Sequence, residues 1–249
     1  MRRLVELSVF PLLSVMEKEN LGGPHPVFAG GERYVSPRFA AVAEQVLRQE
    51  LDAAGLGGRS DYLEFLELLG IVQRASVEYY GWVTGADESY AVLAASVGNT
   101  AVTVVRQGER VAFEPVEPKR MLEVLAYRLP DVKPAVGDGW SVSYTDFRAS
   151  GRLEGSVMRR SAGARPEGAR RLDSLLTASR LSVGKLYAAK RVAGGDRVRA
   201  ERWLTVLDVV DGRWALSVAS RRGDLWITAQ PGSDSVIAGK LTELAASVS

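Results

Sequence analysis

A predicted three-stranded β-meander between Arg202 and Gln230 constrains the fold of this chain more than any other stretch. It reads RWLTVLDVVDGRWALSVASRRGDLWITAQ, in which β-branched and aromatic residues recur at strand spacing. Asp211-Gly212 and Gly223-Asp224 supply the turn chemistry between the strands, and Pro231 ends the last one. Strands this apolar need a second surface to bury against, so the rest of the chain must supply it.

A similar pattern occurs in the first half of the chain. An offset of 114 residues places Val206-Leu207 over Val92-Leu93 and Gly212 over Gly98, and one added residue then aligns the helices that follow. These matches indicate an internal duplication of strands and helix, although any two β-meanders align passably. Two copies with one apolar face each would most simply join into a single sheet around a pseudo-two-fold axis.

We therefore predict an α+β fold with a central, mostly antiparallel β-sheet flanked by helices and built from two quasi-symmetric halves. Residues 1–249 would form one domain, with one half at 1–148 and the other at 149–249. A flexible linker rich in Arg and Gly is expected at 150–168.

Hydrophobic periodicity and turn signals place the other elements. The expected strands are 4–7, 76–83, 89–97, 100–106, 109–114 and 182–192. Helices are expected after Ser8, from Ser36-Pro37 to Gly55, from Ser60, from Pro118 to before Pro130, near Thr145, and at 170–179. The second of these should bury Phe39, Ala43, Val46, Leu47, Leu51 and Ala54 on one face.

Residues capable of catalysis or metal binding are scarce. The chain has no cysteine, which excludes disulfides, thiolate catalysis and cysteine metal sites. Its single histidine, His25, lies between two prolines, where a structural role is favoured over a catalytic one. Asp208 and Asp211 could be paired carboxylates, but Asp211 suits the turn and Asp208 a strand edge. We expect no enzyme activity, no cofactor and no metal.

The segment from Gly232 to Thr242 resembles a phosphate-binding loop only superficially. Six residues instead of four separate its glycines, and Leu241 stands where the magnesium-binding hydroxyl would be. The same residues predict a helix capped by Ser233 or Asp234. Glu6 interrupts the apolar N-terminal run, and no stretch reaches the length of a membrane span, so we expect a cytoplasmic protein without membrane insertion.

Two basic blocks suggest an alternative function. Residues 148–171 and 180–202 each carry a balance of +5 in a chain whose net charge is only +2. Tryptophans near these cations would permit stacking on nucleic-acid bases. Because an alternating strand normally points its tryptophan into the core, the buried interpretation is favoured. Nucleic-acid binding is the alternative function, and we expect no nucleic-acid partner.

The order of the predicted elements resembles the EspG family, the actinobacterial proteins associated with ESX (type VII) secretion. It begins with a capped N-terminal helix, a strand pair with a long loop, and the linker. Three motifs follow: a strand rich in small residues (GKLYAAKR), a strand ending in an Asp and a Gly-Arg turn (LDVVDGRW), and a Trp-bearing strand followed by a proline and the last helix (LWITAQPGSDSVIAGKL). The resemblance covers essentially the whole chain. This chain departs from the commoner members in its shorter length and its extra linker arginines.

The resemblance implies a cytosolic chaperone that holds PE/PPE-like, or WXG-type, helical heterodimers soluble before export. It places the partner contacts on the loop 84–88 and on the C-terminal sheet and helix. The residues expected to contact the partner are Gly85, Asp87, Trp203, Trp226, Ser235 and Ile237. An exposed sheet edge or helix would also allow a homodimer.

Overall fold

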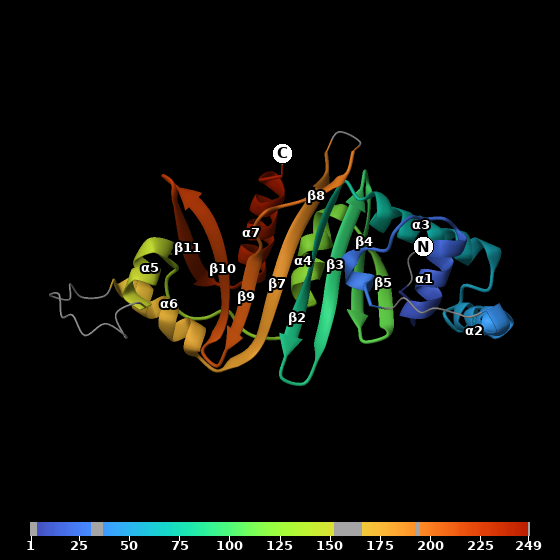
Figure 1. Cartoon of the computed structure of the whole chain (residues 1–249), viewed down its shortest axis with the longest axis horizontal. Coiled ribbons are helices and arrows are strands. Elements are labelled where there is room, and N and C mark those ends of the chain that lie inside the picture. The colour runs from blue at the N-terminus through green and yellow to red at the C-terminus, as the bar shows by residue number, and fades with distance from the viewer. Residues whose placement is uncertain (1–3, 31–36, 152–165, 193–194, 249) are drawn as a thin grey trace.

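The computed structural model describes residues 4–30, 37–151, 166–192 and 195–248. Its centre is one 11-stranded sheet, and every strand pairing in the described residues is antiparallel. The strand order is β1-β5-β4-β3-β2-β7-β9-β10-β11-β6, with β8 paired to β7 outside this path (Figure 1). The predicted α+β class with a mostly antiparallel sheet is confirmed.

The strands have these bounds: β1 Val5–Ser8, β2 Val77–Gly85, β3 Ser89–Val97, β4 Thr100–Gln107, β5 Arg110–Val116, β6 Trp140–Ser143, β7 Arg180–Arg191, β8 Arg197–Arg199, β9 Leu204–Val209, β10 Gly212–Arg221 and β11 Asp224–Pro231. The α-helices are α1 Val9–Lys18, α2 Ala40–Ala53, α3 Arg59–Arg74, α4 Met121–Tyr127, α5 Tyr144–Gly151, α6 Glu167–Thr177 and α7 Asp234–Ala246. Short 3₁₀ helices η1 Pro26–Phe28, η2 Pro37–Phe39 and η3 Pro118–Arg120 precede or connect them.

The two stretches of meander join at the middle of the sheet through β2 and β7, which pair from Val77 with Lys190 to Gly85 with Ser182. Gly98 and Gly212, matched by the sequence offset, both adopt positive φ at hairpin turns, and Ala101 and Ala215 lie in one core cluster. The pseudo-two-fold repeat and the division into halves remain predictions. The short strand β6, from the first half by sequence, pairs with β11 at the far edge.

The sheet has two sides, which we call front and back. Side chains alternate along each strand, so Tyr80, Leu93 and Leu207 face the front, whereas Tyr79, Leu186 and Val206 face the back. Helices α4 and α7 cover the middle of the back and form a core cluster there with Met121, Leu125, Ile237 and Leu241. The predicted helix cap is confirmed, because the Ser233 side chain accepts a hydrogen bond from the backbone N–H of Val236.

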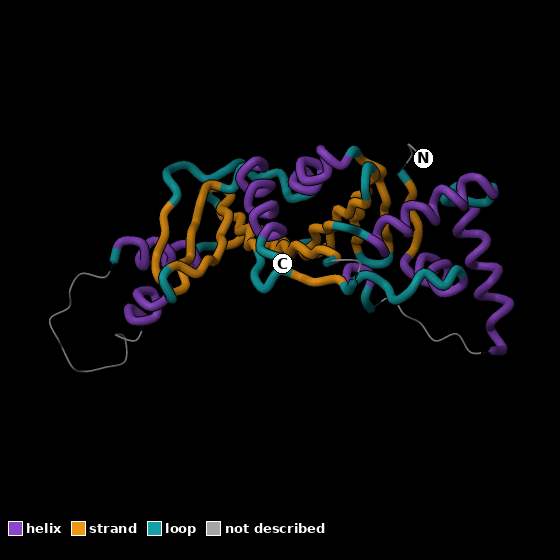
Figure 2. Tube along the Cα trace, turned by 90° about the horizontal axis from the view of Figure 1, so that it is seen from above, coloured by secondary structure: helices purple, strands orange, loops and turns teal. Residues whose placement is uncertain are grey.

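The front is covered only near its two ends. Helices α1 and α3 pack over β3, β4 and β5 through residues such as Leu12 and Phe65, and η1 with Phe28 packs over part of β2 and β3. At the other end, α5 and α6 pack over β6 and the neighbouring strands through residues such as Leu172. Figure 2 shows helices gathered at the two ends of the sheet and on one side of its middle. The front of the central strands is therefore left without a covering helix.

Several local expectations are corrected by the structure. Helix α2 buries only Leu47, and Phe39, Val42 and Val46 are exposed, because α2 lies at the periphery against α1 instead of on the sheet. Helix α3 begins at Arg59, one residue before the expected Ser60. The short strands β6 and β8 were not expected. The predicted linker at 150–168 falls mostly on residues 152–165, outside the described residues.

Asp208 is not at a strand edge, as the sequence suggested, but fully buried within β9. Arg213 donates to both of its carboxylate oxygens at 2.7 and 2.9 Å, and Ser182 donates to it at 2.6 Å. The same guanidinium donates to the backbone carbonyl of Pro130, so the ion pair holds the loop after α4 against the sheet. A Cβ on Gly212 would meet Ala135 Cα at 2.7 Å, so the close approach of this loop also requires glycine there.

No helix among the described residues is long and apolar enough to cross a membrane.

Candidate partner-binding face

The front of the central strands carries four aromatic rings linked by ring contacts, which we call the aromatic patch: Tyr80, Trp82, Tyr187 and Trp203. Tyr80 is its buried end, beneath His25 and Arg197. Tyr80 stacks on Tyr187 with ring centroids 5.5 Å apart, and Trp82 meets Tyr187 edge to face at 5.9 Å. Trp203, just before β9, lies 6.2 Å from Tyr187. Trp82 is 41% exposed and Trp203 43% exposed. Two large rings this open on a sheet face indicate a binding surface.

Two exposed cations lie over the aromatic patch. The Lys185 ammonium is 5.6 Å from the centroid of Trp203, and the Arg199 guanidinium is 5.1 Å from the centroid of Tyr187. Both distances are in the range of cation–π attraction. The rings therefore hold positive charge at the surface of the patch.

The close pairing of β2 and β7 sets the spacing of these rings. A Cβ added to Gly81 would meet the Lys185 carbonyl oxygen at 2.0 Å, so only glycine allows the two backbones to lie this near. Gly81 stands between Tyr80 and Trp82 and pairs with Leu186, next to Tyr187, so it allows the close approach of the strands at the position where these rings meet. The patch is thus built on the most central pair of strands in the sheet.

A buried polar cluster supports one end of the patch. The Glu78 carboxylate accepts hydrogen bonds from His25 Nε2 at 3.1 Å and from Arg197, whose guanidinium lies over the Tyr80 ring. The Val27 N–H donates to His25 Nδ1 at 3.2 Å, so the neutral imidazole carries its proton on Nε2. Burial raises the pKa of the Glu78 carboxyl, but the hydrogen bonds from His25 and Arg197 and the positive charge of Arg197 outweigh it and leave the pKa below its ordinary value. His25 is thus a satisfied structural residue.

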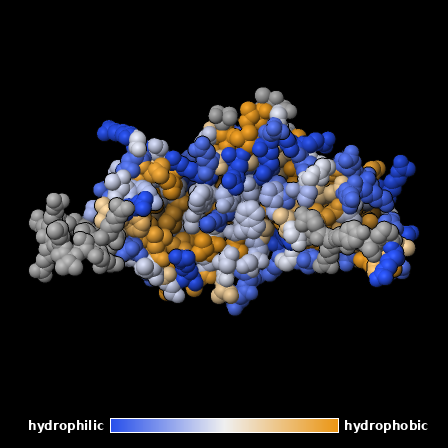
Figure 3. Space-filling model, in the orientation of Figure 1, coloured by the Kyte–Doolittle hydropathy of each residue, from blue (hydrophilic) through white to orange (hydrophobic). Residues whose placement is uncertain are grey.

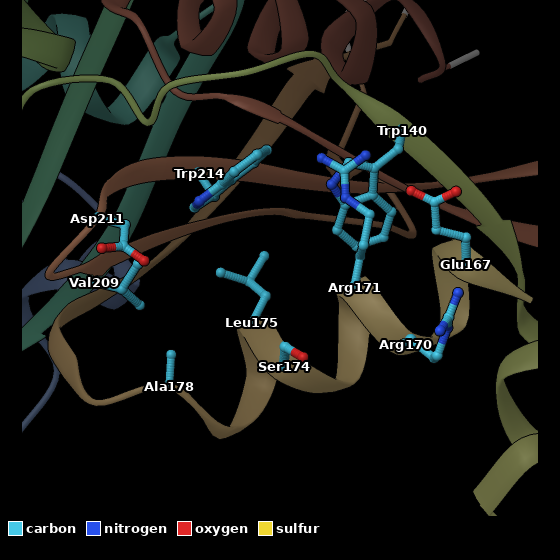
Figure 4. Close-up of a pocket in the computed structure, with 10 residues that line it drawn as sticks. All are labelled: Trp140, Glu167, Arg170, Arg171, Ser174, Leu175, Ala178, Val209, Asp211 and Trp214. Carbon is cyan, nitrogen blue, oxygen red and sulfur yellow. The ribbon is translucent and has the colours of Figure 1, made fainter. Parts of the chain in front are cut away.

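Apolar side chains extend the open front toward α6. Leu181, Val218 and Leu225 are exposed there, and Figure 3 shows a hydrophobic surface on this side of the molecule. Next to it, a pocket of about 360 Å³ lies between α6 and strands β9 and β10 (Figure 4). Its walls include Trp140, over whose ring the Arg171 guanidinium lies at 5.2 Å, and Trp214. The front face therefore offers both aromatic and aliphatic contact area.

The six residues predicted to contact a partner do not form one surface. Trp203 is part of the aromatic patch. Gly85 and Asp87 lie at the β2–β3 turn, where Asp87 is exposed and the Gly85 N–H donates to the Glu88 carbonyl at 2.8 Å. Thr84 follows Trp82 on the same side of β2, so this turn continues from the patch.

The other three predicted contact residues belong to the back. Trp226 pairs with Ala219 and Ser143 and is half-buried on the back side of β11. Ser235 is exposed in the first turn of α7, beside a pocket of about 710 Å³ that also contains Tyr127 and Lys133. Ile237 is fully buried between α7 and the sheet, so its side chain has no surface to offer a partner in this conformation.

Sequence reasoning missed Trp82, Lys185, Tyr187 and Arg199. A signal was present in β2. One side of this strand mixes polar and aromatic residues, since alternate positions are occupied by Glu78, Tyr80, Trp82 and Thr84. That composition is typical of a side that is not wholly core. The general expectation that strand tryptophans are buried concealed it.

The described residues contain no group of three or more His, Cys, Asp or Glu side chains that could hold a metal ion.

Comparisons with known proteins bear on the whole chain. A solved structure of the Mycobacterium tuberculosis type VII secretion system chaperone EspG5, in complex with a PE25-PPE41 dimer, is similar to this chain with a TM-score of 0.72. The similarity covers 99% of this chain and 97% of that one at 13% sequence identity, so it concerns the fold. A search of curated proteins found no significant match. The family model described as the EspG family matches residues 9–243, and the chain belongs to this family.

Proposed function

We propose that this protein is a cytoplasmic chaperone of an ESX (type VII) secretion system that holds a PE/PPE-like helical pair soluble before export. Membership of the EspG family supports this role, and so does a fold shared with a chaperone solved in complex with a PE25-PPE41 dimer. The observation that carries the proposal is the aromatic patch, two large exposed rings on the uncovered middle of a sheet. The role requires no catalysis.

The shape and chemistry of the front suit the apolar tip of a helical pair. Covering elements lie at both ends of the front and leave the middle free, so a narrow tip can reach β2, β7 and β9 between them. Trp and Tyr give large contact area at a low entropy cost, and such rings are enriched where binding energy concentrates. Leu181 and Val218 add aliphatic area beside them. Covering a partner's apolar tip in this way would keep that tip from aggregating.

The β2–β3 turn is the second contact in this proposal. Asp87 is exposed at its apex, and the turn lies at the end of the strand that carries Trp82. We keep Gly85 and Asp87 as contact residues and place the main contact at Trp203 and its neighbours. Trp226 and Ser235 would require a separate contact on the back side.

Nucleic-acid binding is the second candidate, favoured by one observation: the exposed rings of the aromatic patch lie beside Lys185 and Arg199. Base stacking on aromatics with nearby cations is a known mode of single-strand binding. It predicts an affinity that falls steeply as salt concentration rises.

Co-expression tests the chaperone proposal. We would produce the protein with each of several PE/PPE-like or WXG-type pairs encoded near its gene and separate the products by gel filtration with light scattering. The proposal expects a stable complex with at least one pair, lost on Trp203→Ser but retained with Tyr127→Ser, a more exposed ring on α4 at the back. Failure to form a complex with any pair, while a single-stranded oligonucleotide binds, would favour the second candidate.

A further inference from the structure

The two cations of the aromatic patch, Lys185 and Arg199, are the charged groups nearest its exposed rings. Among the residues that the structure describes, no carboxylate forms an ion pair with Lys185 or Arg199. Arg197, the next cation along β8, differs because Glu78 pairs with it and is itself buried. The patch therefore presents two uncompensated positive charges next to exposed rings.

The exposed carboxylates near the patch, Asp87 and Glu88 at the β2–β3 turn and Glu201 before Trp203, form no ion pair with Lys185 or Arg199 in the described residues. Lys185 faces Trp82 on one neighbouring strand and Thr205 on the other. The front-facing positions next to Lys185 and Trp82 are apolar or uncharged: Thr84, Val183, Tyr187 and Leu207. Farther along the strands, Glu78 is buried and paired with Arg197, and Arg180 and Arg191 are further cations. Asp224, at the β10–β11 turn, already accepts hydrogen bonds from Thr145 and from the N–H of Leu225. An occupant of this surface thus meets apolar and aromatic groups together with two positive charges.

We propose that the open face selects a helical tip that is apolar and carries a carboxylate, and that Lys185 and Arg199 determine this specificity. The inference rests on the proposed function and names the chemistry of the partner that the same surface would accept. A docked tip excludes water from the patch, and cations that lose their water need an anion in its place. A carboxylate on the tip can accept a charge-assisted hydrogen bond from either cation, whereas a cationic tip would meet two like charges.

A phosphate backbone would also satisfy the two cations, but the rest of the surface favours a protein tip. Binding a nucleic-acid strand requires a track of cations that follows its phosphates. Here the side of the open face toward α6 is aliphatic at Leu181 and Val218, and Arg180, the cation of β7 on that side, donates to the Leu176 carbonyl of α6. Apolar side chains of a helical tip match that combination.

The decisive experiment uses three synthetic two-helix hairpins with the same Leu- and Phe-containing tip, which differ only in one tip residue: Glu, Gln or Lys. Binding to the full chain is followed by its tryptophan fluorescence, to which the exposed Trp82 and Trp203 contribute. The Glu hairpin should bind about tenfold or more tighter than the Lys hairpin, with the Gln hairpin between them. Lys185→Glu and Arg199→Glu should each reduce this preference, and together they should reverse it.

Arg221→Glu is the matched control for net charge. Arg221 is exposed on β10 and faces the back by strand alternation, so this variant should keep the wild-type order of the three hairpins. Equal binding of the three hairpins, or binding of none, contradicts the proposal. The proposal is also contradicted if a dodecameric oligo(U) binds the wild-type protein more tightly than the Glu hairpin does, and if the double variant binds this oligonucleotide more weakly.

The outcome for the secretion pairs separates this inference from the proposed function. If the double variant Lys185→Glu/Arg199→Glu binds a PE/PPE-like pair as tightly as the wild type, the charge specificity is wrong and the chaperone role stands. If the wild type binds no such pair but prefers the Glu hairpin, the charge specificity stands and the proposed function fails.

Discussion

Trp203 lies 6.2 Å from Tyr187, ring centroid to ring centroid, and is still 43% exposed on a sheet whose ends and back are covered by helices. This contact joins the central strand β7 and the residue just before β9 in one surface. It leads to the first prediction.

Trp203→Ser should weaken partner binding far more than it weakens the fold. A partly exposed ring outside a strand contributes little to stability, so the free energy of unfolding should change by about 1 kcal/mol or less. At an interface the same ring would be a main contact, and its loss should cost about tenfold or more in Kd. Isothermal titration calorimetry and urea unfolding measure the two effects, with Tyr127→Ser as the control. A loss of stability that accounts for the loss of binding would make Trp203 structural.

Arg213→Met should destabilise the protein by about 3–5 kcal/mol, because it leaves the Asp208 carboxylate buried without its ion pair. Urea unfolding measures the change. Arg221→Met in the same strand is the control, and it should alter the free energy of unfolding by no more than about 0.5 kcal/mol. Adding Asp208→Asn to Arg213→Met should restore part of the loss, since the buried charge is then removed. Equal effects of the two arginine substitutions would contradict this account of the pair.

Gly81→Ala should be destabilising by about 1–3 kcal/mol or more, because its methyl group would collide with the Lys185 backbone and force β2 and β7 apart. Gly239→Ala in α7 is the matched substitution, with nothing within 4 Å of the added methyl. It should be stabilising by about 0.5–1 kcal/mol through helix propensity. Thermal and urea unfolding of both variants give the comparison, and a neutral Gly81→Ala would show that the strands can separate without cost.

Glu78 should make the stability of the fold depend on acid. Its pKa in the folded protein lies below the ordinary value of 4.5, so the ionised form is favoured by folding. The resulting stabilisation is present above pH 4.5 and is lost as the pH falls through the folded pKa. The difference in free energy of unfolding between wild type and Glu78→Gln should therefore shrink on acidification from pH 7. If the difference in free energy of unfolding between the two proteins stays the same from pH 7 into the acid range, the pKa of Glu78 is not lowered by folding, which would contradict this account.

The β2–β3 turn provides a further test of the contact region. Replacing residues 84–88 with a short Gly-Ser turn should abolish partner binding and leave the melting temperature nearly unchanged, because Asp87 and Glu88 are exposed. Differential scanning fluorimetry and pull-down with the partner pair measure the two properties. A large drop in melting temperature would assign the turn a structural role instead.

Much of the sheet could be predicted from the sequence, since its turns are local. Gly98, Gly108, Gly212 and Gly223 adopt positive φ, and each marks a hairpin between strands with clear apolar patterns. Strands β6 and β8 were missed because WSVS and RVR are too short to show a period, and their pairing partners lie far away or across a turn.

The binding face could not be located from local patterns. Alternation puts Trp203 and Trp226 on opposite sides of the sheet, but which side stays uncovered depends on where α1, α3, α6 and α7 pack. Those positions are set by tertiary contacts. The exposed apolar residues of α2 illustrate the same limit. A helical period shows that one face of a helix is apolar, but it does not show which part of the protein covers that face.

Site-specific photo-crosslinking tests the central claim most directly. A benzoylphenylalanine in place of Trp203, and in a second protein in place of Tyr127, would be irradiated in complex with a PE/PPE-like pair and the products analysed by mass spectrometry. The docking of a helical tip on the open front predicts crosslinks from position 203 to the tip of the pair and none from position 127. Crosslinks from position 127 alone would place the partner on the back of the sheet and contradict the account.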